Sequence, residues 1–89
     1  MILHPRIKGF YEYLKTLNIA ALTKPDLLLK LKEKGATPTE AAITLYQGFD
    51  IPLEESEDIM GKLQLFPQEE IEEIAIQTLE YLYYDGNDD

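Results

Sequence analysis

The sequence predicts an all-α fold, a compact bundle of about five short helices, and three observations support this prediction. Apolar residues recur at intervals of three and four along most of the 89 residues, which is the repeat of one helix face. No segment alternates apolar and polar residues long enough to form a half-buried strand. Residues that favour the start or the end of a helix occur at short intervals along the chain. We therefore expect short links between helices that run roughly antiparallel to their neighbours.

The first helix is predicted over residues 5–17. Pro5 suits its first turn, because the N–H that proline lacks would have no helical partner there. Asn18 is expected to end the helix. The expected core face consists of Ile7, Phe10, Leu14 and Leu17.

The second helix is predicted to begin at Thr23 or Lys24 and to close at Gly35. Asp26 falls in its first turn, where a negative charge complements the exposed amides. Leu29 points away from the face of the other leucines, so the helix is either covered on both sides or leaves this leucine exposed. The expected core face consists of Leu27, Leu28 and Leu31.

The segment 37–40 carries the clearest local signal in the chain. Thr37 can cap the backbone amide of Glu40, whose carboxylate can reach back to the Thr37 amide, with Pro38 in the first helical position. A third helix therefore begins here, and Gly48 is expected to take a left-handed conformation at its end. Its expected core face consists of Ala42, Leu45, Tyr46 and Phe49.

The fourth helix follows the turn 48–52 and ends before Phe66-Pro67. Ser56 lies on its inner face, where its hydroxyl is expected to bond back to the helix backbone. Together the third and fourth helices, residues 37–63, have the outline of a helix-turn-helix corner. The acidic start of the fourth helix would be repelled by phosphate, so we do not expect it to read DNA. The expected core face consists of Leu53, Ser56, Met60 and Leu63.

A fifth, continuous helix is predicted from about Pro67 to Tyr84. We interpret residues 1–84 as a single helical domain, because a chain of this length buries too little surface for a second core. Residues 85–89 are too polar to pack and are predicted to be a flexible acidic tail. The expected core stripe of the fifth helix consists of Ile71, Ile74, Ala75, Leu79 and Leu82.

The net charge of −9 is distributed unevenly along the chain. Residues 1–34 hold seven basic and three acidic side chains, whereas from residue 35 onward Lys62 is the only base among fourteen acids. Nucleic acids and anionic membranes are therefore poor candidate partners, because both are bound through lysine and arginine. The polarity favours a basic protein as the partner.

The sequence offers little catalytic machinery, so we expect no enzyme activity, no cofactor and no metal. The chain has no cysteine, which removes disulfides, thiolate metal sites and cysteine nucleophiles. His4 is the only histidine and has no carboxylate within helical reach, so we expect it to be a capping or exposed side chain. No apolar run has the length of a signal peptide or a membrane span, and the cytoplasm is the expected location.

A candidate partner-binding surface runs along the acidic fourth helix and one flank of the fifth. There, carboxylates alternate with an outward-facing isoleucine and with at least one outward-facing tyrosine. Tyrosine supplies contact area at low entropic cost, and negative charge steers a basic partner. The candidate residues are Glu54, Glu55, Glu57, Asp58, Glu69, Glu72, Ile76, Glu80, Tyr83, Tyr84 and Asp85.

Three functions are compatible with these features. The leading hypothesis is a non-enzymatic protein interaction module that covers a basic site on its partner, in its sharpest form an inhibitor or immunity protein for a bacterial toxin. The chain resembles the colicin immunity proteins in size, acidity and the pairing of tyrosines with acids. The alternatives are a structural small subunit that self-associates, with the basic half of one copy meeting the acidic half of another, and a metal-dependent enzyme that uses surface carboxylates.

Overall fold

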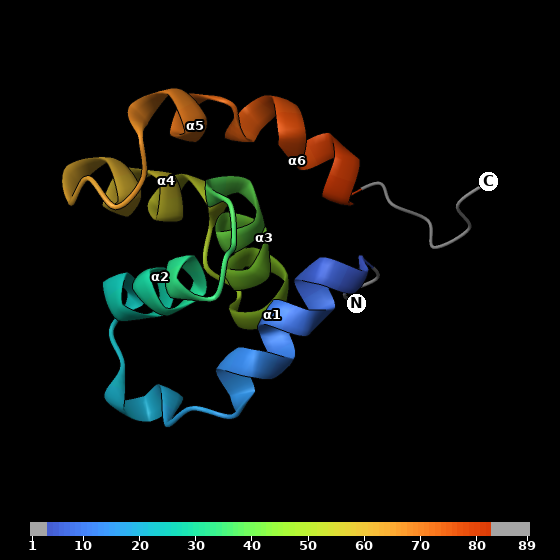
Figure 1. Cartoon of the computed structure of the whole chain (residues 1–89), viewed down its shortest axis with the longest axis vertical. Coiled ribbons are helices and arrows are strands. Elements are labelled where there is room, and N and C mark those ends of the chain that lie inside the picture. The colour runs from blue at the N-terminus through green and yellow to red at the C-terminus, as the bar shows by residue number, and fades with distance from the viewer. Residues whose placement is uncertain (1–3, 83–89) are drawn as a thin grey trace.

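The computed structural model describes residues 4–82, and the side chains of residues 4–78, as an assembly of helices (Figure 1). No strand occurs within this range, so the predicted all-α class is confirmed. A short 3₁₀ segment at Ile19–Ala21 precedes the second α-helix. The α-helices are α1 (Pro5–Lys15), α2 (Lys24–Glu33), α3 (Pro38–Phe49), α4 (Leu53–Lys62), α5 (Gln68–Glu72) and α6 (Ile74–Leu82).

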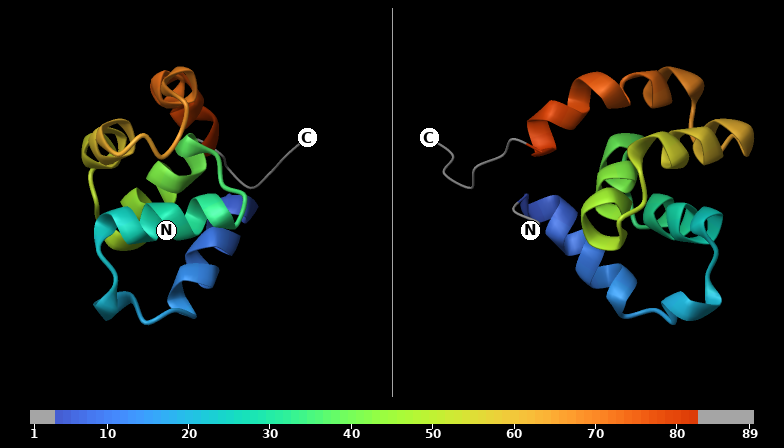
Figure 2. Two further views of the ribbon diagram at one scale, coloured as in Figure 1. Left: turned by 60° about the vertical axis from the view of Figure 1, so that its left-hand side comes forward. Right: turned by 180° about the vertical axis from the view of Figure 1, so that it is seen from behind.

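Helix α3 is the centre of the packing. It contacts α1, α2, α4, α5 and α6, and both views in Figure 2 show it enclosed by them. All eight residues from Pro38 to Leu45 are buried, which is more than one face of the helix. The predicted capping box is confirmed, because the Thr37 hydroxyl accepts from the Glu40 amide and the Glu40 carboxylate accepts from the Thr37 amide.

An ion pair joins α1 to α3. The Arg6 guanidinium donates from Nε to Oε2 of Glu40 at 2.5 Å and from Nη2 to Oε1 at 3.0 Å. The Glu40 side chain is only 3% exposed, whereas that of Arg6 is 57% exposed. Glu40 therefore serves both the start of α3 and the attachment of α1, and only the first role is predictable from the local sequence.

Helices α1 and α2 start where their sequences indicate, but α1 ends at Lys15 with Thr16 as its cap, two residues before the predicted end. His4 caps α1 by accepting the Arg6 amide on Nδ1, and Thr23 and Asp26 form a second capping box at the start of α2. Gly35 has a φ of +98° and ends α2, with the amide of Ala36 donating back to the carbonyl of Leu31. Leu29 is 41% exposed, so α2 is covered on one face only.

The end of α3 corrects two predictions. Gly48 is helical, and the left-handed residue is Asp50, with a φ of 58°. Gly48 is required for another reason: a Cβ there would lie 2.5 Å from Cδ1 of Tyr11, so its absence lets α1 approach α3 closely. Tyr46, predicted to lie in the core, is 45% exposed.

Helix α4 buries Ser56 and Met60, as predicted, but Leu63 is 54% exposed and lies outside the core. The helix ends at Lys62, Leu63 caps it, and the next residue, Gln64, takes a left-handed φ of 53°. Leu63 therefore lies just beyond the last helical residue, where the face predicted from the helical repeat no longer applies. The Ser56 Oγ is buried and has no hydrogen-bond partner among the described residues, so the predicted bond to the helix backbone is absent.

The predicted fifth helix is two helices, because the chain breaks between α5 and α6 at Glu73. The Glu73 amide donates to the carbonyl of Glu70, three residues back, which is the bond of a tightened turn. Beyond the break Ala75 is exposed instead of buried, while Thr78 is buried and its hydroxyl donates to the carbonyl of Ile74. Ile71 and Ile74 are buried as predicted.

The structure leaves the corner of α3 and α4 and the end of the chain as predictions. Helices α3 and α4 pack against each other across a short link, but the helix-turn-helix character of that corner stays a prediction. The side chains of Leu79 and Leu82 and the tail 85–89 lie outside what the structure describes. Within residues 4–82, no helix combines the length and apolar character that crossing a bilayer requires.

Candidate acidic interaction surface

The four candidate acids of α4 divide into two kinds. Glu55 forms an ion pair with Lys24 of α2, and Asp58 forms one with Lys62 at 3.0 Å. Glu54 is exposed and Glu57 is half-buried, and neither pairs with a base among residues 4–82. Only these last two offer an uncompensated carboxylate to a partner.

The short helix α5 presents its acids to solvent because a single residue, Ile71, supplies its buried contact. Glu69, Glu70 and Glu72 are exposed, and so is Glu73 at the break before α6. Gln68 donates a long hydrogen bond of 3.4 Å to Glu72. No lysine or arginine of the described residues pairs with these four carboxylates.

We call the uncompensated carboxylates of α4, α5 and the break the acidic surface. They lie on helices that occupy the upper part of the molecule in Figure 1. The members of the acidic surface are Glu54, Glu57, Glu69, Glu70, Glu72 and Glu73.

An open cleft of about 320 Å³ lies where the start of α3 meets the junction of α5 and α6. Glu70 and Glu73 line it, together with Gln77, whose side-chain oxygen accepts from the Thr39 hydroxyl at 2.8 Å. Thr37 and Pro38 form the α3 side of the cleft. The cleft is of a size to admit one long side chain between two carboxylates.

The cleft residues were not among the candidates from sequence. Their grouping follows from the break at Glu73. No proline or glycine in this part of the sequence indicates that the helix breaks there. If residues 67–84 formed one straight helix, Glu70 and Glu73 would lie on its outer face. The one signal in the sequence was the density of acids over residues 69–73.

The remaining candidates lie on α6 or beyond it. Ile76 is 74% exposed, one turn after Glu73, so the prediction that it faces away from the core is confirmed. Glu80 belongs to α6, but its side chain lies outside the described set. Tyr83, Tyr84 and Asp85 also lie outside the described residues, so the tyrosine contribution to this surface stays a prediction.

Partial burial raises the pKa of Glu57, and the charge of Glu54 one turn earlier raises it further. A raised pKa means that the folded protein favours the protonated acid, so the charged form opposes folding above that pKa. Glu57→Gln is therefore expected to raise the free energy of unfolding at pH 7 by about 0.2–0.5 kcal/mol, the size of a like-charge contact on a helix. The gain should shrink as pH falls through the raised pKa and vanish below the ordinary value of 4.5.

Urea unfolding of both proteins between pH 3 and pH 7 measures this difference. Asp26→Asn is the control of opposite sign, because the Thr23 amide and hydroxyl lower the pKa of Asp26. That variant should lose stability at neutral pH and approach the wild type as pH falls through the lowered pKa. A Glu57→Gln gain that does not depend on pH would contradict the assigned cause.

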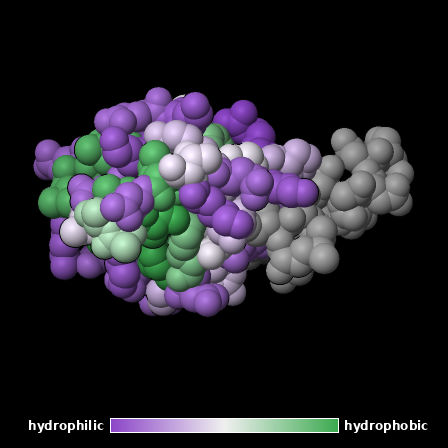
Figure 3. All heavy atoms as spheres, turned by 90° about the horizontal axis from the view of Figure 1, so that it is seen from below, coloured by the Kyte–Doolittle hydropathy of each residue, from purple (hydrophilic) through white to green (hydrophobic). Residues whose placement is uncertain are grey.

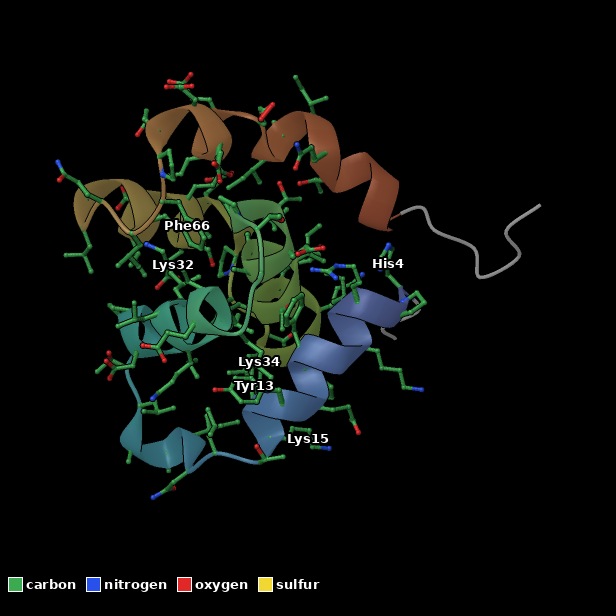
Figure 4. The ribbon with its side chains drawn as sticks, viewed as in Figure 1. His4, Tyr13, Lys15, Lys32, Lys34 and Phe66 are labelled. Carbon is green, nitrogen blue, oxygen red and sulfur yellow. The ribbon has the colours of Figure 1, made fainter. Side chains whose placement is uncertain are left out.

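A second open pocket, of about 480 Å³, lies between the end of α2 and the link from α4 to α5. Lys32 and Phe66 line it, with the lysine ammonium 5.6 Å from the ring centroid, and Figure 4 shows the two side by side. Gln64 and Gln68 supply its other polar groups. No carboxylate lines this pocket, so it is distinct from the acidic surface.

Within the described part of the chain, no three histidine or acidic side chains are grouped so that they could hold a metal ion. No protein-family model matches the chain, and neither a curated protein nor a solved structure matches it. The candidate function therefore rests on the geometry and charge of the surface.

Proposed function

We propose that this chain is a non-enzymatic interaction module that binds a basic protein through the acidic surface. The single observation that carries the proposal is the group of six carboxylates on α4, α5 and the break at Glu73 that no described base neutralises. Like charges at this density repel one another and oppose folding. A partner that brings lysine or arginine relieves this repulsion and also gains steered association.

The cleft at the α5–α6 junction gives the proposal a point of specificity. A basic side chain that enters it meets Glu70 and Glu73 together, with the oxygen of Gln77 nearby as a further acceptor. Arginine is the better fit of the two bases, because its planar group donates to two acceptors at once. The rest of the acidic surface would then steer the approach more than it sets the lifetime of the complex.

In its sharpest form, the module is an inhibitor that covers a basic site of a toxin or of another enzyme. The support for this form is the resemblance in size and charge to immunity proteins, together with a surface that has charge but no catalytic group. The exposed Ile76 beside Glu72 and Glu73 supplies the apolar contact that such interfaces place among charges.

The proposal is tested by replacing Glu70 and Glu73 with glutamine and using wild type and variant as baits in a lysate of the source cells. Wild type should retain a basic protein in stoichiometric amount at low salt and release it at high salt. The variant should retain at least about tenfold less, the loss expected for two charge-assisted hydrogen bonds at an interface.

The matched control replaces Glu12 and Glu33, two exposed acids of the other half of the molecule, with glutamine. This control has the same net charge as the test variant, so it separates the effect of position from that of total charge. It should retain the partner as the wild type does. Equal loss in both variants, or no loss in either, would show that the cleft does not bind the partner.

A further inference from the structure

Two lysines on the opposite half of the molecule each lie over a tyrosine ring. The ammonium of Lys15 lies 5.2 Å from the ring centroid of Tyr11, and that of Lys34 lies 4.8 Å from that of Tyr13. No carboxylate of the described residues is within ion-pair distance of either lysine. Cation–π contacts hold both charges in place, which reduces the entropy that a partner would have to remove.

Exposed small apolar residues follow Lys15 along the chain. The 3₁₀ segment Ile19–Ala21 buries none of its residues fully, and Ala20 and Ala21 are exposed. Between residues 13 and 25 the only charged side chains are Lys15 and Lys24. Figure 3, the view from below, shows hydrophobic atoms gathered on this side of the molecule with hydrophilic atoms around them. We call Lys15, Lys34 and residues 19–22 the lysine surface.

The lysine surface and the acidic surface are complementary in kind. The first has cations beside small apolar residues, and the second has carboxylates beside Ile76, which is 74% exposed. They lie on different sides of one molecule, because α1 and the segment 19–21 occupy the lower part of Figures 1 and 4 and α5 and α6 the upper part. One copy therefore cannot satisfy both surfaces by itself.

We propose that the chain self-associates head to tail, with the lysine surface of one copy on the α5–α6 acidic surface of a second copy. This inference rests on the proposed function, since it names a second copy as a basic partner of the same acidic surface. Such a contact is heterologous, so its repetition produces either a closed ring or an open chain. Both patches are small, so the contact is weak, exchanges rapidly and is broken by salt.

Self-association competes with binding of any other basic partner, because both use Glu73 and the acidic surface around it. At a high concentration of the chain the acidic surface would therefore be covered by a second copy, and dilution would expose it. The competition follows from the shared site and needs no conformational change.

Sedimentation equilibrium of the wild-type chain tests the proposal. At about 1 mM chain and about 0.02 M salt, the weight-average mass should reach at least about 1.5 times that of the monomer, as expected for a millimolar Kd. It should return to the monomer value of 10.2 kDa at about 0.5 M salt, where screening is within a few ångströms. A wild-type chain that is monomeric under the first condition overturns the proposal.

Two charge-reversed variants establish the geometry. Lys15→Glu with Lys34→Glu removes one surface, and Glu72→Lys with Glu73→Lys removes the other. Each variant alone should stay monomeric, with the helical circular dichroism of the wild type. Their equimolar mixture should associate to at least about twice the monomer mass, because each keeps the surface that the other lacks and the two reversed surfaces again have opposite charges. A variant that associates as strongly as the wild type overturns the head-to-tail geometry.

The lysine variant also separates this proposal from the proposed function. It keeps the acidic surface, so it should still capture a basic protein, and more readily than the wild type at equal concentration. A wild type that captures such a protein but never self-associates overturns the self-association while the proposed function stands. Self-association that the Glu72→Lys, Glu73→Lys variant retains overturns the role of the acidic surface in self-association and leaves the proposed function standing.

Discussion

Replacing Leu45 with alanine is expected to lower the free energy of unfolding by about 2–5 kcal/mol. Leu45 is completely buried in α3 and belongs to the cluster of buried residues that α1, α2 and α4 share. Truncation removes apolar contact and leaves a cavity that several helices would have to close together. Because domains of this size are stable by only about 5–15 kcal/mol, the variant should be close to unfolding at 37 °C. Thermal and urea unfolding followed by circular dichroism measure the loss.

Tyr46→Ala is the matched control for Leu45→Ala, because it removes a larger side chain from the next position of the same helix. Tyr46 is 45% exposed, so we expect a loss below about 1 kcal/mol. The pair also tests the correction to the predicted core face of α3. A Tyr46→Ala loss as large as that of Leu45→Ala would contradict the orientation of this helix.

Replacing Arg6 with methionine is expected to lower the free energy of unfolding by about 1–3 kcal/mol. Methionine keeps much of the apolar stem but removes the two hydrogen bonds to the nearly buried Glu40 carboxylate. Removal of one partner of a fully buried ion pair would lower the free energy of unfolding by more than this. Here solvent reaches the exposed guanidinium of Arg6 and weakens its attraction to Glu40. For a chain of this length, each kcal/mol lowers the Tm by about 4–8 °C.

A double-mutant cycle with Glu40→Gln isolates the ion pair. Glutamine can still close the capping box with the Thr37 amide, so this substitution removes the charge and leaves the helix start in place. In the Glu40→Gln background, Arg6→Met should cost at least about 1 kcal/mol less than in the wild type. Additive losses would mean that Arg6 stabilises the protein through Phe10, 5.3 Å below its guanidinium, and not through Glu40.

The acidic surface was predictable in composition but not in arrangement. The sequence indicates which helices carry the acids, and the structure leaves Glu69 and Glu72 exposed as expected. It could not indicate that Glu55 is neutralised by Lys24, because the two residues are 31 positions apart and meet only when α2 packs beside α4. The cleft lined by Glu70 and Glu73 likewise forms only because the helix breaks between α5 and α6 and this junction lies beside the start of α3.

The sequence by itself determined the all-α class and the starts of α1 to α5, because those signals act within a single turn. The capping bonds between Thr37 and Glu40 and between Thr23 and Asp26, and the bond that the Gly35 amide donates to the Lys32 carbonyl, each span at most four positions. Only the tertiary structure decided which residues cover α3, where the last helix breaks, and which charges are compensated. These outcomes depend on contacts between segments that are distant along the chain, and the physical reason is that such contacts become favourable only when several helices bury the same core together.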